Sequence, residues 1–96
     1  MSYALVIADE AAQDLDALIE SLPSSRRADA IEGVEAALNH LTSNPLSKAK
    51  EHVGRPAYEF TFRAGGVTYH WAATYQITQD ERSLVITHVY KVPRIL

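Results

Sequence analysis

The feature of this sequence that most constrains its fold is a change in hydrophobic period near the middle of the chain. Before residue 45 apolar residues recur at the spacing of an α-helix, whereas after residue 57 they alternate with polar ones. A period of 3.6 places apolar side chains on one face of a helix, and a period of 2 places them on one face of a strand. We therefore predict helices in the first half and an antiparallel sheet in the second, which is an α+β fold.

Two helices are predicted before residue 45, after a short apolar strand at residues 3–7. Asp9 is expected to cap the first helix, and Pro23 ends it because proline cannot continue a helix. Ser24 or Ser25 is expected to cap the second. The apolar residues at helical spacing are Ala11, Leu15, Leu18, Ile19 and Leu22 in the first helix, and Ala30, Ile31, Val34, Ala37, Leu38 and Leu41 in the second.

The second half is predicted to form three consecutive antiparallel strands after a polar connection at residues 45–56. The strands cover residues 58–63, 67–78 and 84–90, and the paired glycines at 65 and 66 make the first hairpin turn. The expected order is β-α-α-β-β-β, with the two helices packed on the sheet in a single domain that spans residues 1–96. The N-terminal strand can pair with either the edge or the centre of the meander.

Charge is distributed unevenly along the chain, whose formal net charge is −3. Residues 1–46 contain eight acidic and two basic residues, whereas residues 47–96 contain four acidic and seven basic ones. Phosphate contacts supply most of the affinity of a protein for nucleic acid. Any anion site is therefore expected in the second half of the chain.

Composition also bears on the cellular location. The sequence has no cysteine, which excludes disulfides and cysteine-based metal sites. No apolar run approaches the roughly 20 residues that a membrane-spanning helix needs. Asp9 and Glu10 come too early for the apolar core of a signal peptide. We therefore expect a cytoplasmic protein.

Several short motifs follow one another in a characteristic order. They are Ala12-x-Asp14-Leu15-x-x-Leu18, Asn44-Pro45, Gly54-x-Pro56-x-Tyr58, Phe62-Arg63 before Gly65-Gly66, and Val89-Tyr90-Lys91-Val92-Pro93-Arg94. This order resembles the RelE/ParE superfamily of small bacterial toxins over nearly the whole chain. The resemblance implies two helices packed on a sheet and a cognate antitoxin protein as partner. RelE-type members cleave messenger RNA in the ribosomal A site, and ParE-type members poison DNA gyrase.

Metal-free RNA cleavage needs a base for the ribose 2′-hydroxyl, a cation for the phosphate and an acid for the leaving oxygen. Glu59 and Arg63 project from the same face of one predicted strand, and His88 and Tyr90 are assigned to one face of the last. The resemblance implies that Arg63 and, as a looser match, Arg94 stabilise charge on the phosphate. Glu59 or His88 is then the candidate base, and Tyr90 or His88 the candidate acid.

Four further cations are candidates for RNA binding, namely Lys48, Lys50, Arg55 and Lys91. The histidines show no spacing typical of a metal site on one helix, and we predict no metal or other cofactor. Tyr69, Trp71 and Tyr75 fall on one face of the longest predicted strand, where they are expected to pack in the core beneath the helices. A surface for stacking bases is the alternative role for these three rings.

The sequence departs from RelE at positions that matter for this chemistry. Glu59 and Thr61 stand where RelE carries two lysines, and Tyr90 is the candidate for its C-terminal tyrosine. Three hypotheses follow: a messenger RNA endoribonuclease, a gyrase-directed toxin without enzymatic activity, and an inactive member that serves as an interaction module. Structural interpretations remain for the site residues: Glu59 and Arg63 can form a surface ion pair, and His88 a half-buried hydrogen-bonded residue.

Overall fold

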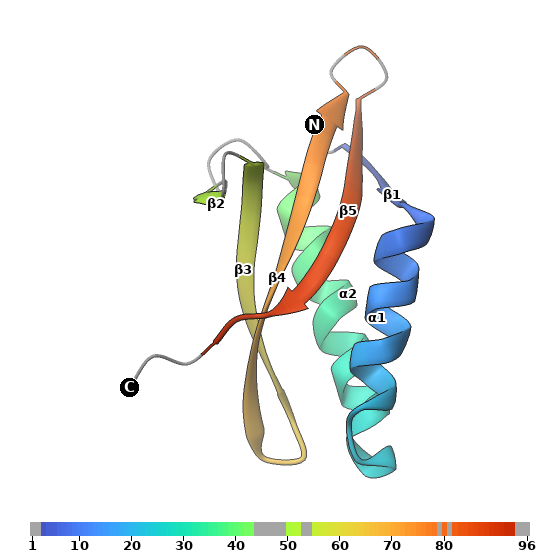
Figure 1. Cartoon of the computed structure of the whole chain (residues 1–96), viewed down its shortest axis with the longest axis vertical. Helices are drawn as coiled ribbons and strands as arrows, with labels where there is room; N and C mark the ends of the chain where they lie inside the picture. Colours follow the sequence, from blue (N-terminus) through green and yellow to red (C-terminus); the bar gives the residue numbers. More distant parts are fainter. Residues whose placement is uncertain (1–2, 44–49, 53–54, 79, 81, 94–96) are drawn as a thin grey trace.

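A computed structural model of the chain describes residues 3–43, 50–52, 55–78, 80 and 82–93, with backbone alone for 50–52 and 55–56. The elements in this part of the chain are β1 (Ala4–Ile7), α1 (Asp9–Glu20), a 3-10 turn η1 (Ser24–Arg26), α2 (Arg27–Ser43), β2 (Lys50–His52), β3 (Arg55–Ala64), β4 (Val67–Thr78) and β5 (Ser83–Lys91) (Figure 1). The predicted α+β class and element order are confirmed, with β2 as an addition. Neither described helix combines the length and the apolarity needed to cross a membrane.

The described strands form one sheet in the order β1-β5-β4-β3-β2. β3, β4 and β5 make an antiparallel meander, and β1 pairs with β5 in parallel. The N-terminal strand therefore joins the edge of the meander rather than its centre. The two helices cover one face of the sheet, with α1 against β5 and α2 against β3 (Figure 1). The opposite face carries no helix within the described ranges, and we call it the open face.

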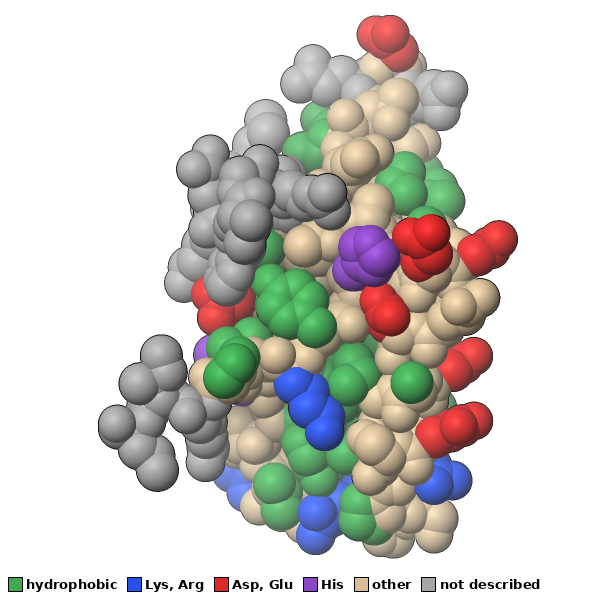
Figure 2. All heavy atoms as spheres, in the orientation of Figure 1, with side chains coloured by type: hydrophobic (Ala, Val, Ile, Leu, Met, Phe, Trp, Pro, Cys, Tyr) green, Lys and Arg blue, Asp and Glu red, His purple; other side chains and the backbone are tan. Residues whose placement is uncertain are grey.

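Charge is separated over the surface of the molecule. Acidic side chains gather on the side where α1 lies, and basic side chains lie toward the end where the β3–β4 hairpin turns (Figure 2). α1 carries acidic residues along its length and none of the basic ones. An anionic ligand is therefore favoured at the hairpin end and disfavoured beside α1.

The β3–β4 hairpin turn sets the register of the central strands. Gly65 and Gly66 have φ angles of 59° and 78°, in the left-handed region that glycine adopts without steric penalty. Two consecutive positive φ angles are typical of a tight type I′ turn, and Ala64 accordingly pairs directly with Val67. Each residue of β3 then has one defined partner on β4, as far as Ala57 opposite Thr74.

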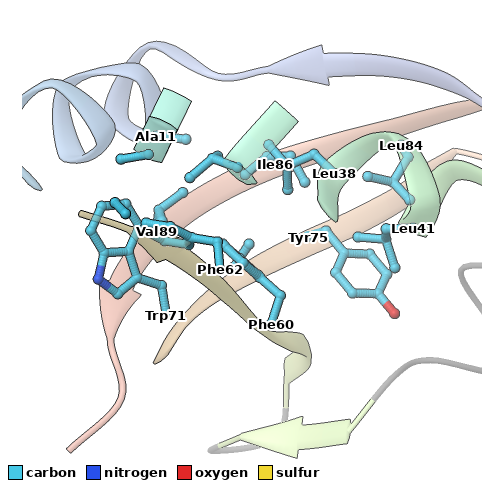
Figure 3. Packing of buried hydrophobic residues seen from close by; sticks show 14 of the residues in the cluster. Ala11, Leu38, Leu41, Phe60, Phe62, Trp71, Tyr75, Leu84, Ile86 and Val89 are labelled. Carbon is cyan, nitrogen blue, oxygen red and sulfur yellow. The ribbon is translucent and has the colours of Figure 1, made fainter. Parts of the chain in front are cut away.

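Aromatic side chains from β3 and β4 form the centre of the core beneath the helices (Figure 3). Phe62 meets Trp71 edge-on, with ring centroids 4.7 Å apart, and Tyr69 stacks against Phe62. Trp71 and Tyr75 are almost fully buried, which confirms the predicted packing of this aromatic face. The helix side chains of the buried cluster are Ala11, Ala30, Val34, Leu38 and Leu41.

Three local predictions are wrong. Ser24 and Ser25 lie within η1 and do not cap the second helix, since α2 begins at Arg27. Asp9 is the first residue of α1 and not its cap; the preceding Ala8 takes the cap position, where its backbone N–H donates to the carbonyl of Ile86. That long-range hydrogen bond, rather than a side chain, defines where the helix starts. Within the predicted polar connection, residues 50–52 form β2 against the start of β3. This strand lacks an apolar alternation, so side-chain periodicity does not reveal it.

Gly33 allows α2 to approach β3 closely. A methyl group at this position would lie 2.5 Å from Cβ of Phe62, well inside van der Waals contact. The contact is with the root of a core side chain, so neither group can rotate away. The absence of a side chain at Gly33 therefore sets the spacing between α2 and the sheet.

Gly33→Ala is expected to lower the free energy of unfolding by about 1–2 kcal/mol, because overpacking outweighs the gain of roughly 1 kcal/mol in helix propensity. Denaturant unfolding followed by circular dichroism measures the change. Glu32→Ala, at an exposed position of the same helix, is the control and should stay within about 0.5 kcal/mol of wild type. A Gly33→Ala protein as stable as wild type would contradict the close approach.

Candidate functional site

The candidate site lies on the open face of the sheet. On β3, Glu59, Thr61 and Arg63 alternate with the core residues Phe60 and Phe62. Because successive side chains of a strand point to opposite faces, the first three project from the open face. The prediction that Glu59 and Arg63 share one face therefore agrees with the observed strand.

Glu59, Ala72 and Tyr90 form one row across three strands. Ala72 on β4 is paired with Glu59 on β3 and with Tyr90 on β5. Directly opposed residues of neighbouring strands project from the same face. A carboxylate and a phenol thus stand on either side of a small, fully buried alanine.

The surroundings of Tyr90 favour the protonated phenol. Partial burial raises the pKa of Tyr90 above its ordinary value, and the negative charge of Glu59 raises it further. Both effects disfavour the phenolate. Tyr90 therefore remains a hydrogen-bond donor and a potential proton donor at neutral pH.

His70 lies beside Glu59 on the neighbouring strand. Its Nε2 atom is 3.4 Å from Oε1 of Glu59, and the two side chains are 40% and 21% exposed respectively. Both residues line a hollow of about 660 Å³ that continues from the open face around the edge of β3 to α2, where Gly33, Ala36, Ala37 and His40 line it. The carboxylate–imidazole pair is thus accessible from solvent, which a purely structural pair in the core would not be.

Arg63 stands near the hairpin end of the same face. It is exposed, and its Nη2 atom donates a hydrogen bond to the carbonyl oxygen of Gly66, 3.2 Å away. Arg63 pairs with Thr68, two residues along β4 from His70. A guanidinium group is therefore anchored at one end of the surface that carries the carboxylate, the imidazole and the phenol.

His88 is directed toward α1. Its Nδ1 atom lies 3.3 Å from Oδ2 of Asp14, and its Nε2 atom 3.7 Å from Oε2 of Glu10. The same Oδ2 atom accepts the backbone N–H of Val89, beyond the point where β1 stops pairing with β5. The pairing of β4 with β5 shifts register between Thr74 and Tyr75. The hydroxyl groups of Thr74 and Thr87 share a hydrogen bond. His88 therefore helps to hold α1 on β5, which supports its structural interpretation.

Comparison with known proteins identifies the fold. No family model matches the sequence, and no curated protein matches it either. Among solved structures, the chain is similar to the isolated E. coli RelE toxin, with 17% identity, 98% of this chain and 88% of that chain covered, and a TM-score of 0.59. It is also similar to a chain of the E. coli RelBE toxin–antitoxin complex, with 18% identity, coverage of 97% and 100%, and a TM-score of 0.60.

A third similar structure is the RelBE2 toxin–antitoxin complex of Mycobacterium tuberculosis. The identity is 26%, 96% of this chain and 100% of that chain are covered, and the TM-score is 0.58. The chain has the RelE toxin fold. The predicted resemblance to the RelE/ParE superfamily is confirmed at the level of the fold, which is the fold of toxins from type II toxin–antitoxin systems.

The RelE fold places several predicted residues together and leaves others undetermined. Glu59, Arg63 and Tyr90 share the open face, and Lys91 lies exposed at the end of β5. Arg94 and Lys48 lie outside the described residues, as do the side chains of Lys50 and Arg55. No cluster of three potential metal ligands occurs among the described side chains.

Sequence reasoning missed His70 as a partner of Glu59. His70 is opposite Thr61 on β3, whereas His88 is opposite Thr74 and contacts α1. The signal that identifies His70 is the two-residue glycine turn. Once Ala64 is paired with Val67, counting outward from the turn places His70 diagonally beside Glu59.

Glu59→Gln is expected to move the pKa of Tyr90 down toward its ordinary value, because the charge that disfavours the phenolate is removed. Carbon-13 NMR of the tyrosine ring carbons during an alkaline titration measures this pKa separately from those of the other tyrosines. Glu10→Gln, which removes a carboxylate beside His88 instead, is the control and should leave Tyr90 unchanged. A pKa of Tyr90 that is the same in Glu59→Gln and wild type would contradict their proximity.

Proposed function

We propose that this chain is the toxin of a type II toxin–antitoxin system and cleaves messenger RNA in the cytoplasm without a metal ion. The observation that carries the proposal is the open face itself, where Glu59, Tyr90 and Arg63 are held by one register on the RelE fold. This reaction needs a proton acceptor, a proton donor and a cation. Glu59 or a residue beside it, the protonated phenol of Tyr90 and the guanidinium of Arg63 can supply them.

Each group has a role that its surroundings support. Arg63 stabilises the charge that develops on the phosphate, since its guanidinium is exposed and fixed at the hairpin end. Tyr90 protonates the leaving 5′-oxygen, because burial and Glu59 keep the phenol protonated. Glu59 takes part in removing the proton from the 2′-hydroxyl. His88 faces α1, so we assign neither proton transfer to it.

The net charge of the chain limits which form of RNA it can bind. The chain has a net charge of −3, so free RNA is not held by a broad basic surface. Messenger RNA presented by the ribosome avoids this requirement, because the ribosome already holds the strand. We therefore propose translated message as the substrate. An antitoxin partner is proposed because two of the similar structures are toxin–antitoxin complexes.

A second candidate function rests on an apolar hollow of about 700 Å³ between β1 and the two helices. Its apolar lining consists of Leu5, Ile7, Leu15, Ile19, Ile31, Val34 and Leu38. Large exposed apolar surface of this kind favours a protein partner. In this alternative the chain is a non-enzymatic toxin that occupies DNA gyrase, or an inactive member that serves as an interaction module.

Induced expression in a bacterial host separates these functions. Wild type is expected to arrest growth and to leave cleaved message, mapped by primer extension. Arg63→Ala should lose roughly 10²-fold or more of the cleavage, because it removes charge stabilisation from the transition state. Arg82→Gly is the matched control. It also removes one arginine, and glycine suits the positive φ of 51° at this position in the opposite turn.

The possible outcomes point to different functions. Cleavage by wild type and Arg82→Gly but not by Arg63→Ala supports the ribonuclease. Growth arrest with intact message supports a gyrase-directed or other protein-binding toxin. Absence of both effects supports an inactive member. Equal cleavage by wild type and Arg63→Ala contradicts the assigned role of the guanidinium.

A further inference from the structure

We propose that His70 is the catalytic base of this reaction and that Glu59 is the residue that positions it. The inference rests on the proposed ribonuclease function and names a proton acceptor that the sequence pattern did not identify. It assigns Glu59 to orienting the imidazole rather than to taking the proton.

His70 is fixed by backbone pairing on both sides of its strand. It pairs with Thr61 of β3, and its carbonyl oxygen accepts the backbone N–H of Val92, 3.0 Å away. A residue on an inner strand of a sheet is held more rigidly than one on a loop. The backbone of His70 is therefore held in place. Its side chain is 40% exposed, so a substrate can reach it.

The contact with Glu59 selects one tautomer of the imidazole. Nε2 of His70 is the nitrogen that faces the carboxylate oxygen, at 3.4 Å. A carboxylate accepts hydrogen bonds and cannot donate them when ionised, so the proton of the neutral ring belongs on Nε2. The lone pair is then on Nδ1. In the serine-protease triad a carboxylate likewise orients a histidine base, although there it faces Nδ1 and Nε2 takes the proton.

An imidazole also suits the reaction better than a carboxylate does. A general base works best when its pKa lies near the working pH, and histidine is the side chain that ordinarily titrates there. Glu59 is more buried than His70 and stands at one end of the row that crosses β4 to Tyr90. Its charge can hold His70 and, after proton transfer, stabilise the imidazolium.

The hollow beside the pair gives a nucleotide room to approach. Its volume of about 660 Å³ is in the range of small-molecule sites. The wall from α2 is formed by Gly33, Ala36 and Ala37, which have little or no side chain, and by His40. A ribose can therefore approach His70 around the edge of β3. Arg63 does not line the hollow but lies diagonally across from His70 on the open face.

The proton and bond changes balance within this set. Nδ1 of His70 takes the proton of the 2′-hydroxyl as the 2′-oxygen forms a bond to phosphorus. The bond from phosphorus to the 5′-oxygen breaks, and the phenol of Tyr90 gives its proton to that oxygen. The products are a 2′,3′-cyclic phosphate and a free 5′-hydroxyl. Water then returns a proton to Tyr90 and removes one from His70.

The test compares two variants of similar shape. His70→Gln keeps a donor that can face Glu59 but removes the titrating base, and Glu59→Gln keeps His70 but removes the carboxylate. Purified proteins are added to a translation reaction that contains one reporter message, and the cleavage rate is measured from pH 5 to pH 9. Gln13→Ala, at an exposed position of α1 that lines no part of this hollow, is the control. Circular dichroism establishes that each variant is folded.

We expect His70→Gln to lose roughly 10²-fold or more of the rate and to lose the acidic limb of the pH profile, because a base that must be deprotonated is gone. Glu59→Gln should lose less and keep that limb, since the imidazole of His70 is still present. Nitrogen-15 NMR of wild type should find the proton of neutral His70 on Nε2. Gln13→Ala should cleave within about twofold of wild type.

Three results would overturn the proposal. Retention of a third or more of the wild-type rate by His70→Gln would rule out the imidazole as the base. Loss of the acidic limb in Glu59→Gln but not in His70→Gln would make the carboxylate the base. A neutral His70 protonated on Nδ1 would place the lone pair on the wrong nitrogen. If Arg63→Ala abolishes cleavage and His70→Gln does not, only this proposal fails, whereas absence of cleavage by wild type removes the ribonuclease function as well.

Discussion

The tight turn at Gly65 and Gly66 is the constraint on which both the core and the candidate site depend. It pairs Ala64 with Val67 and so sets which residues of β3 and β4 face each other. Because side chains alternate between faces, a slip of one residue would turn the aromatic face away from the helices. The same register that seats Phe62 against Trp71 therefore also places Glu59 on the open face.

The two helices hold the sheet in different ways. α2 approaches β3 closely because Gly33 has no side chain to meet Phe62. α1 is fastened to β5 by a polar contact, in which Asp14 accepts the backbone N–H of Val89 and lies beside His88. This contact covers a stretch of strand edge that β1 does not reach. It also ties His88 to α1, although that side chain remains 44% exposed.

Much of the fold follows from the sequence by local rules. The period of the apolar residues predicts both helices and all three strands of the meander, and the glycine pair predicts the first hairpin. The pairing of β1 with β5 and the short strand β2 could not be predicted, because they depend on backbone hydrogen bonds between distant segments. The start of α1 is another such case, since the bond from Ala8 to Ile86 places it.

The candidate site, too, could be predicted from the sequence only in part. Alternation along β3 predicts that Glu59 and Arg63 share a face, and counting from the turn would have added His70. The direction of His88 could not be predicted, because it depends on an irregularity near Thr74 and on the packing of α1. The likeness to RelE structures at low identity shows the fold, so the chemistry of this chain must be judged from its own side chains.

The most direct measurement for the whole account is the chemical identity of the RNA ends after cleavage. Mass spectrometry of the products from a translation reaction, with purified wild-type protein, determines it. A reaction in which the 2′-oxygen attacks the phosphate predicts a 2′,3′-cyclic phosphate on one fragment and a 5′-hydroxyl on the other. Fragments that carry a 3′-hydroxyl and a 5′-phosphate would show attack by water instead, and would contradict the catalytic arrangement derived for the open face.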